Sequence, residues 1–199
     1  SANHNQITAL PDQFAVNSPK LITLNLYNNS LLHFSELYST VWTELRVLNL
    51  SKNKLTQLPA NIGEYKSLEV LKASQNTIAI LPDSIGNCKH LTTLCIDENS
   101  ILSLPIELEK NQRLRTLNVS KNGLTRIDGN LLKALGSSGL VNLYCYKNKI
   151  SSLPPSIGHI GTLQILSISN NKLTKLPDEI GGLENLLELY VGGKNNGTF

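Results

Sequence analysis

Apolar residues recur at a fixed spacing along almost the whole chain. The recurring phrase is Leu-x-x-Leu-x-Z-x-x-Asn-x-(Leu/Ile), in which Z is an aliphatic residue or Cys. Its copies begin at Leu21, Leu45, Leu68, Leu91, Leu114, Leu140, Leu163 and Leu186. Successive starts are 23 residues apart, except for 24 after Leu21 and 26 after Leu114. A period of this length predicts a repeat protein built from stacked supersecondary units.

Each copy contains the pattern of a short, half-buried strand. In the copy that starts at Leu45, Leu48 and Leu50 alternate with Val47, Asn49 and Ser51. Such a period of two buries one face of a strand, and stacking the copies pairs each strand with the next in a parallel sheet. We therefore predict an α/β repeat solenoid, with the sheet on the concave face and short 3-10, α or irregular segments on the convex face.

An Asn column confirms the register independently. The Asn eight residues after each start recurs in every copy but the last, and one more belongs to a copy that begins before residue 1. The column is Asn5, Asn29, Asn53, Asn76, Asn99, Asn122, Asn148 and Asn171. Because a side-chain amide both donates and accepts, these residues are predicted to form a ladder that satisfies main-chain groups at the turn after each strand.

The second half of four copies reads Leu-Pro-x-x-Ile-Gly. These segments begin at Leu58, Leu81, Leu153 and Leu176. With the Leu and Asn phrase, the sequence resembles the leucine-rich-repeat family, in the intracellular variant of Ras-associated scaffolds, plant intracellular Ras-group proteins and Roco proteins. The resemblance covers residues 1–199, as one horseshoe domain of eight to nine repeats.

Two copies depart from the Leu-Pro pattern. After Asp128, Leu131, Leu132 and Leu135 recur at helical spacing, which predicts a short convex helix and accounts for the longer copy. In the copy that starts at Leu21, Trp42 is predicted to fill the convex core.

The chain has no Met, and residue 1 is Ser. We expect a longer natural protein in which further repeats or other domains flank this region. Lys194 stands in the Asn column of the last copy, with Asn195 one step late, an irregularity expected near the end of an array.

Composition, charge and the absence of known motifs reduce the number of functions that the sequence favours. The chain is 40% hydrophobic, and its net charge is only +3, so neither nucleic acid nor a membrane surface is favoured as a partner. The four His residues are isolated, and neither a phosphate-loop motif nor a nucleophile elbow occurs. No catalytic, cofactor or metal site is predicted.

The three Cys residues favour a reducing compartment, and we expect a cytoplasmic location. Cys88 and Cys145 occupy slots that otherwise hold Leu-type residues and are predicted to be buried. Cys95 is predicted to be a surface thiol on the concave face.

Exposed positions are predicted at the third, fifth, seventh and eighth residues of each copy, which project from the concave sheet. Most are small and polar. The exceptions are Tyr144, Tyr146 and Lys147 on one strand, Arg115 and Lys121 on the strand before it, and Tyr190 two strands later. Tyr and Arg dominate interface hot spots, so we predict a protein-binding patch roughly 15 Å wide, from a strand spacing of about 4.8 Å.

A second candidate is the acidic pair Asp97 and Glu98. Lys72 and Arg115 are expected to flank it, giving an acidic centre between basic neighbours that would suit a partner of mixed charge.

The predicted function is a noncatalytic protein-interaction module or scaffold. The resemblance implies signalling through a small GTPase or a phosphatase. Two alternatives stay open. One is a targeting segment of a larger enzyme, such as a kinase, cyclase, phosphatase or ubiquitin ligase. The other is an extracellular receptor, for which sequons at Asn28, Asn49, Asn118 and Asn196 would be glycosylated.

Overall fold

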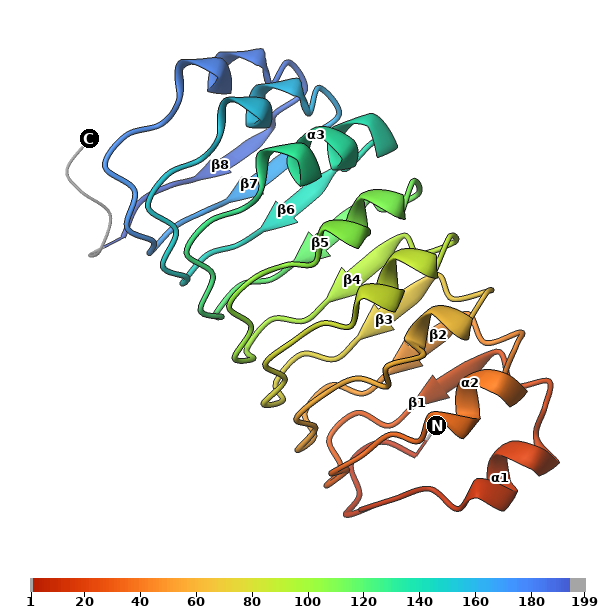
Figure 1. Cartoon of the computed structure of the whole chain (residues 1–199). Helices are drawn as coiled ribbons and strands as arrows, with labels where there is room; N and C mark the ends of the chain where they lie inside the picture. Colours follow the sequence, from red (N-terminus) through yellow and green to blue (C-terminus); the bar gives the residue numbers. More distant parts are fainter. Residues whose placement is uncertain (1, 194–199) are drawn as a thin grey trace.

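The computed structural model describes residues 2–193, and the predictions for Lys194, Asn195 and Asn196 lie outside them. Strands and helical segments alternate along the chain (Figure 1). The strands are β1 (Thr23–Asn25), β2 (Val47–Asn49), β3 (Val70–Lys72), β4 (Thr93–Cys95), β5 (Thr116–Asn118), β6 (Asn142–Tyr144), β7 (Ile165–Ser167) and β8 (Glu188–Tyr190). The helices are α1 (Asp12–Asn17), α2 (Leu37–Val41) and α3 (Gly129–Ser138), and the 3-10 segments are η1 (Ile62–Glu64), η2 (Asp83–Asn87), η3 (Ile106–Lys110), η4 (Pro155–His159) and η5 (Asp178–Gly182).

The strands form one parallel sheet in chain order, from β1 to β8. The second Leu of each copy lies beside the second Leu of the next, as Leu117 does beside Leu143. Figure 1 shows the strands side by side, with the helical segments on the opposite face of each coil. The predicted α/β solenoid with a parallel sheet is confirmed.

The strands are shorter than the alternation suggested. Each spans only the third to fifth residues of its copy, and the eighth residue lies in a turn with left-handed backbone. This conformation recurs in His4, Asn28, Lys52, Gln75, Glu98, Lys121, Lys147 and Asn170, with φ between 50° and 58°. The prediction that the eighth residues project from strands is therefore wrong. They sit where the chain reverses toward the core, a conformation that β-branched side chains disfavour.

The ladder forms as predicted, and Asn148 shows its geometry. Its Nδ2 donates to the Val119 carbonyl of the preceding repeat and to the Cys145 carbonyl of its own, both at 3.0 Å. Its Oδ1 accepts from the Leu124 N–H of the preceding repeat at 3.0 Å. One side chain thus satisfies three buried main-chain groups that the turn leaves unpaired.

The convex layer packs so tightly that the Gly of the Ile-Gly motif is needed for clearance. A Cβ at Gly63 would meet the carbonyl oxygen of Ser84 in the next repeat, and a Cβ at Gly158 would meet that of Glu179. At Gly181, in the last 3-10 segment, nothing lies within 4 Å of such a Cβ. Close contact between successive convex segments is the reason for the motif.

Helix α3 replaces a 3-10 segment where the sequence predicts a helix. The Asp128 carboxylate accepts from the Asn130 and Leu131 N–H groups and caps its first turn. Gly139 ends it with φ +84°, a conformation that favours Gly. Leu131, Leu132 and Leu135 are buried, as expected.

Aromatic rings fill the convex core near the N-terminus. Trp42 is fully buried, as predicted, and packs against Tyr38 at a centroid distance of 4.8 Å and against Phe14 of α1 at 5.8 Å. The Tyr38 hydroxyl donates to the Leu10 carbonyl at 2.6 Å. These larger side chains occupy the volume that Pro-started segments fill elsewhere.

Candidate functional site

The concave face of the sheet carries two rows of side chains whose order follows from the register. The last residues of the strands form one row, from Asn25, Asn49, Lys72, Cys95 and Asn118 to Tyr144, Ser167 and Tyr190. The residues two positions later form the other row. Neighbours in a row belong to strands about 4.8 Å apart.

The tyrosine patch comprises Tyr144, Tyr146 and Tyr190. Ser167 lies between Tyr144 and Tyr190 in the register and is only 8% exposed, although it faces the concave side. Ser120 occupies the equivalent position in the copy before that of Tyr146, and its hydroxyl is buried without a hydrogen-bond partner. Because small buried serines lie beside large rings, the surface at this end of the concave face is uneven.

Tyr190 is the most exposed ring of the tyrosine patch, at 51%. Its hydroxyl donates to a Glu188 carboxylate oxygen at 2.7 Å. That bond and the charge of Glu188 raise the pKa of Tyr190 from its ordinary value of 10.0, which already leaves the phenol protonated at neutral pH. The ring is therefore presented to solvent as a neutral group with its polar end already engaged.

Lys121 and Glu98 form an ion pair across neighbouring repeats, with Nζ 2.8 Å from Oε1. The hydrogen bond from Lys121 lowers the pKa of Glu98, and the same bond raises the pKa of Lys121. Both side chains remain about one-third exposed. The predicted acidic centre is thus partly neutralised by Lys121.

Asp97 is held by neutral donors. One carboxylate oxygen accepts from the Ser74 hydroxyl at 2.6 Å and from the Asn118 amide at 3.0 Å. Lys72 lies exposed beside Cys95 on the adjacent strand. The structure therefore places Asp97 in a hydrogen-bond network that crosses three repeats.

Arg115 does not join either predicted group, and its guanidinium contacts a different element. Nη1 donates to the Ser138 carbonyl at the end of α3 and to the Leu114 carbonyl at 3.4 Å. A cation is stabilised at a helix C-terminus by the unpaired carbonyls and the helix dipole. Arg115 directly precedes β5, three residues before Asn118 and about 10 Å along the sheet from the row that contains Tyr144. The expected flanking of Asp97 by Arg115 is wrong, because the Arg115 guanidinium is bonded to the end of α3 and forms no ion pair with Asp97 within residues 2–193.

The cysteines lie as follows. Cys88 and Cys145 are fully buried as predicted, and burial raises the pKa of each thiol to about 12. Cys95 is half-buried rather than fully on the surface. Burial, and then the charge of Asp97, raise its pKa as well. A protonated thiol is a poor nucleophile, so none of the three has the environment of a reactive cysteine.

Within residues 2–193, no group of three or more His, Cys, Asp or Glu is arranged to hold a metal ion. In the same part of the chain, no helix is both long enough and apolar enough to cross a membrane.

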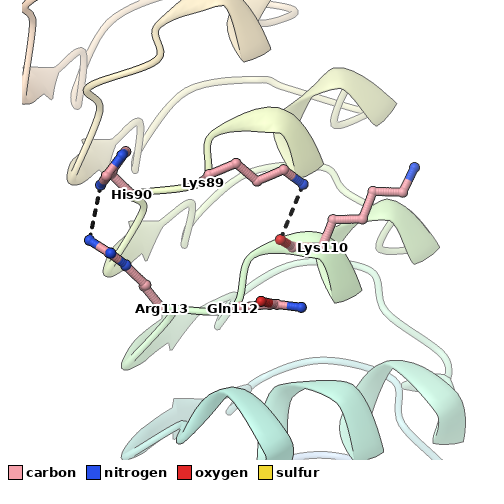
Figure 2. Close-up of a pocket in the computed structure, with 5 residues that line it drawn as sticks. All are labelled: Lys89, His90, Lys110, Gln112 and Arg113. Atoms are coloured by element: carbon pink, nitrogen blue, oxygen red, sulfur yellow. Dashed lines mark hydrogen bonds between the residues drawn. The ribbon is translucent and has the colours of Figure 1, made fainter.

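Sequence reasoning missed a basic pocket at the other end of the strands. Lys89, His90, Lys110, Gln112 and Arg113 line a pocket of about 400 Å³ (Figure 2). The only sequence signal is a run of basic residues just before the starts at Leu91 and Leu114. His90, predicted to be isolated, lies beside Arg113. The five side chains come from two successive repeats and meet only when the coils stack.

Comparison with known proteins identifies the family of this repeat fold. A family model described as "Leucine-rich repeat region" matches residues 21–138, and a second, "Leucine Rich Repeat", matches residues 162–183. No curated protein sequence matches the chain.

Three solved structures show the extent of the likeness. The ectodomain of the Arabidopsis thaliana receptor kinase GASSHO1/SCHENGEN3 is 30% identical with a TM-score of 0.83, over 98% of this chain and 23% of that one. A repeat protein of Leptospira interrogans is 27% identical with a TM-score of 0.67, over 98% and 59%. The functional domain of InlJ from Listeria monocytogenes is 26% identical with a TM-score of 0.75, over 95% and 40%.

The chain thus spans less than two thirds of each of these proteins. Its repeat phrase, its Asn ladder, its parallel sheet and the matched family model agree, and the chain belongs to the leucine-rich repeat family.

Proposed function

We propose that this domain is a noncatalytic protein-interaction module whose partner binds the concave face at the tyrosine patch. The observation that carries the proposal is the pair of tyrosines, Tyr144 and Tyr190, on either side of the small Ser167 in one in-register row. Large rings with few rotatable bonds supply contact area at low entropic cost and are enriched in binding hot spots.

The rigidity of the face supports binding. The row is mounted on a sheet whose strands are fixed by the core and by the Asn ladder, and Asn118 and Asp97 are held by their own hydrogen bonds. A preformed surface loses less conformational entropy on association than a flexible one.

A structural neighbour shows that such repeats can hold a protein ligand. The GASSHO1/SCHENGEN3 ectodomain was solved in complex with CASPARIAN STRIP INTEGRITY FACTOR 2. Small GTPases and phosphatases, the classes implied by the resemblance to intracellular repeats, are the first partners to test against the tyrosine patch.

We further propose a reducing, intracellular location. All three cysteines are free, and two of them are buried in the core. The Asn118 sequon lies between Asp97 and the Ser120 N–H, both of which its amide contacts, so a glycan there would crowd the concave face.

The test is an affinity measurement that compares the unmodified chain with Tyr144→Ala/Tyr146→Ala. Candidate GTPases and phosphatases are titrated against both, and Tyr27→Ala is the matched control. Tyr27 belongs to the same row as Tyr146, at the other end of the concave face, where it contacts His4 and Lys52. We expect loss of at least about tenfold in affinity for the double variant alone.

An equal loss of affinity in the control and in the double variant would mean that the partner does not bind at the tyrosine patch. Full-strength binding to the double variant would place it on another face.

A further inference from the structure

The basic pocket lies at the edge where the chain enters the strands, away from the tyrosine patch. Lys89 and His90 precede β4, Lys110 ends η3, and Gln112 and Arg113 precede β5. Figure 2 shows the His90–Arg113 pair on one side of the pocket and the two lysines on the other. All five side chains can donate hydrogen bonds, and none is a carboxylate.

Two of the cations are held in position before any ligand arrives. The Lys89 ammonium donates to the Gly86 carbonyl at 2.8 Å and to the Lys110 carbonyl at 3.3 Å. The Arg113 guanidinium lies 3.0 Å from His90 Nδ1 (Figure 2). An ammonium has three protons and a guanidinium has five N–H donors. Both groups therefore retain donors that can point into the pocket.

The pocket also lacks counter-ions. Among residues 2–193, the ion pairs are Arg46–Glu69, Lys66–Glu64 and Lys121–Glu98, so Lys89, Lys110 and Arg113 take part in none. Three positive charges thus share one pocket without a paired carboxylate.

The preceding repeat provides an internal comparison. Lys66 stands 23 residues before Lys89 and likewise donates to a glycine carbonyl, that of Gly63, at 3.1 Å. However, Lys66 also pairs with Glu64 at 3.4 Å. The residue 23 positions after Glu64 is Asn87, which has no charge. Hydrogen bonding to the 3-10 segment explains a lysine in both repeats, but it does not explain why the carboxylate is missing from the second.

The unpaired cations match a phosphate monoester. Its doubly charged oxygens accept several short, charge-assisted hydrogen bonds, and the guanidinium can bind two of them side by side. The five lining residues are all exposed, whereas sites for small molecules bury most of their ligand. An open pocket suits a phosphate that is attached to a larger partner, whose remaining contacts lie on the neighbouring surface.

We propose that this pocket binds the phosphate of a phosphoserine- or phosphothreonine-bearing segment of a partner protein. The proposal rests on the proposed function in that the partner is a protein. It uses a separate surface, so the two can fail independently.

The test is a titration of the isotope-labelled chain, followed by backbone amide NMR at low ionic strength. Three probes are added separately: inorganic phosphate, a Gly- and Ala-based peptide with one phosphoserine, and the same peptide with unmodified serine. We expect saturable shifts at residues 89, 90, 110, 112 and 113 with phosphate and with the phosphopeptide, which binds more tightly. The unmodified peptide should leave these signals in place.

Variants assign the effect to the pocket. Arg113→Gln and Lys110→Gln should each weaken phosphopeptide binding roughly tenfold, because each removes a charge-assisted contact. Lys66→Gln, the counterpart with its own carboxylate, should leave the affinity within about twofold. Tyr144→Ala/Tyr146→Ala should also leave it unchanged, since the tyrosine patch lies at the other end of the strands. Thermal melts of every variant check that the fold is intact.

Three outcomes would overturn the proposal. The first is the absence of saturable shifts at the pocket with phosphate and with phosphopeptide. The second is an equal loss of affinity from Lys66→Gln, which would indicate general attraction to a basic surface. The third is binding to vesicles that contain phosphatidylinositol bisphosphate, dependent on Arg113, without any phosphopeptide binding. That result would identify a lipid headgroup as the ligand.

Discussion

The two faces of the same strands differ in how much they vary from repeat to repeat. On the inner face, the second Leu of every copy is retained from β1 to β8. On the concave face of the same strands, the row changes from Asn and Lys to Cys, Tyr and Ser. A core position must fill a fixed volume between two neighbours, whereas a concave position meets solvent or a partner. The inner face therefore maintains the stack, and the concave face is free to diverge toward recognition.

The largest expected effect comes from truncating the inner face. Leu143→Ala should destabilise the array by about 2–5 kcal/mol, because Leu143 is fully buried and its removal leaves a cavity. Leu189→Ala is the matched control, since Leu189 occupies the same row but is 43% exposed. Denaturant unfolding should show a clearly smaller loss for the control. Equal losses would mean that burial does not set how much an inner-face Leu contributes to stability.

The next effect separates two kinds of Asn on successive coils. Asn148→Ala should lower the free energy of unfolding by about 1–3 kcal/mol, because it leaves buried main-chain groups without a partner. Asn118→Ala is the comparison, because Asn118 faces the concave side and bonds to Ser120 and Asp97 there. We expect a smaller fall in the free energy of unfolding for Asn118→Ala. If it matched Asn148→Ala, the concave network would be as important to folding as the ladder.

A smaller effect on stability is expected at the tyrosine patch. Tyr144→Ala/Tyr146→Ala should change the free energy of unfolding by less than roughly 1 kcal/mol, since both rings are only half-buried. A calorimetric melt checks this directly. A large drop in Tm would show that the two rings stabilise the fold, and it would weaken the argument that they serve binding.

The smallest expected effect is at the Glu98–Lys121 pair. The pKa of Glu98 is lowered in the folded state, so its contribution is present above the ordinary pKa of 4.5 and is lost as the pH falls through the folded-state value. Glu98→Gln should therefore melt slightly below the unmodified chain at pH 7 in low salt. The gap should narrow as the pH falls below 4.5 and Glu98 becomes protonated. A gap that is unchanged at acid pH, or that survives 1 M salt, would show that the charge of Glu98 is not its source.

The sequence predicts the inner face far better than the concave one. Period and residue type alone locate the strands, the ladder, α3 and the buried Trp42, because each core position is constrained locally. The prediction for Arg115 is wrong because its acceptor is the Ser138 carbonyl, 23 residues away at the end of the convex helix of the same copy. The basic pocket was missed for a similar reason, since Lys89 and Arg113 approach only through stacking. Contacts between repeats depend on how neighbouring side chains meet, which spacing within one repeat does not encode.

The ladder gives the stack a direction. Within residues 2–193, the ladder bonds that cross between coils run from Asn76, Asn122 and Asn148 to main-chain groups of the repeat before them. A coil added at the C-terminal side supplies an amide to its predecessor, whereas a coil added at the N-terminal side receives one. Shortening the array is therefore asymmetric. Loss of the first coil leaves an Asn side chain that can rotate into water, while loss of a later coil strips fixed backbone groups of their partner. Growth and fraying should accordingly differ at the two ends.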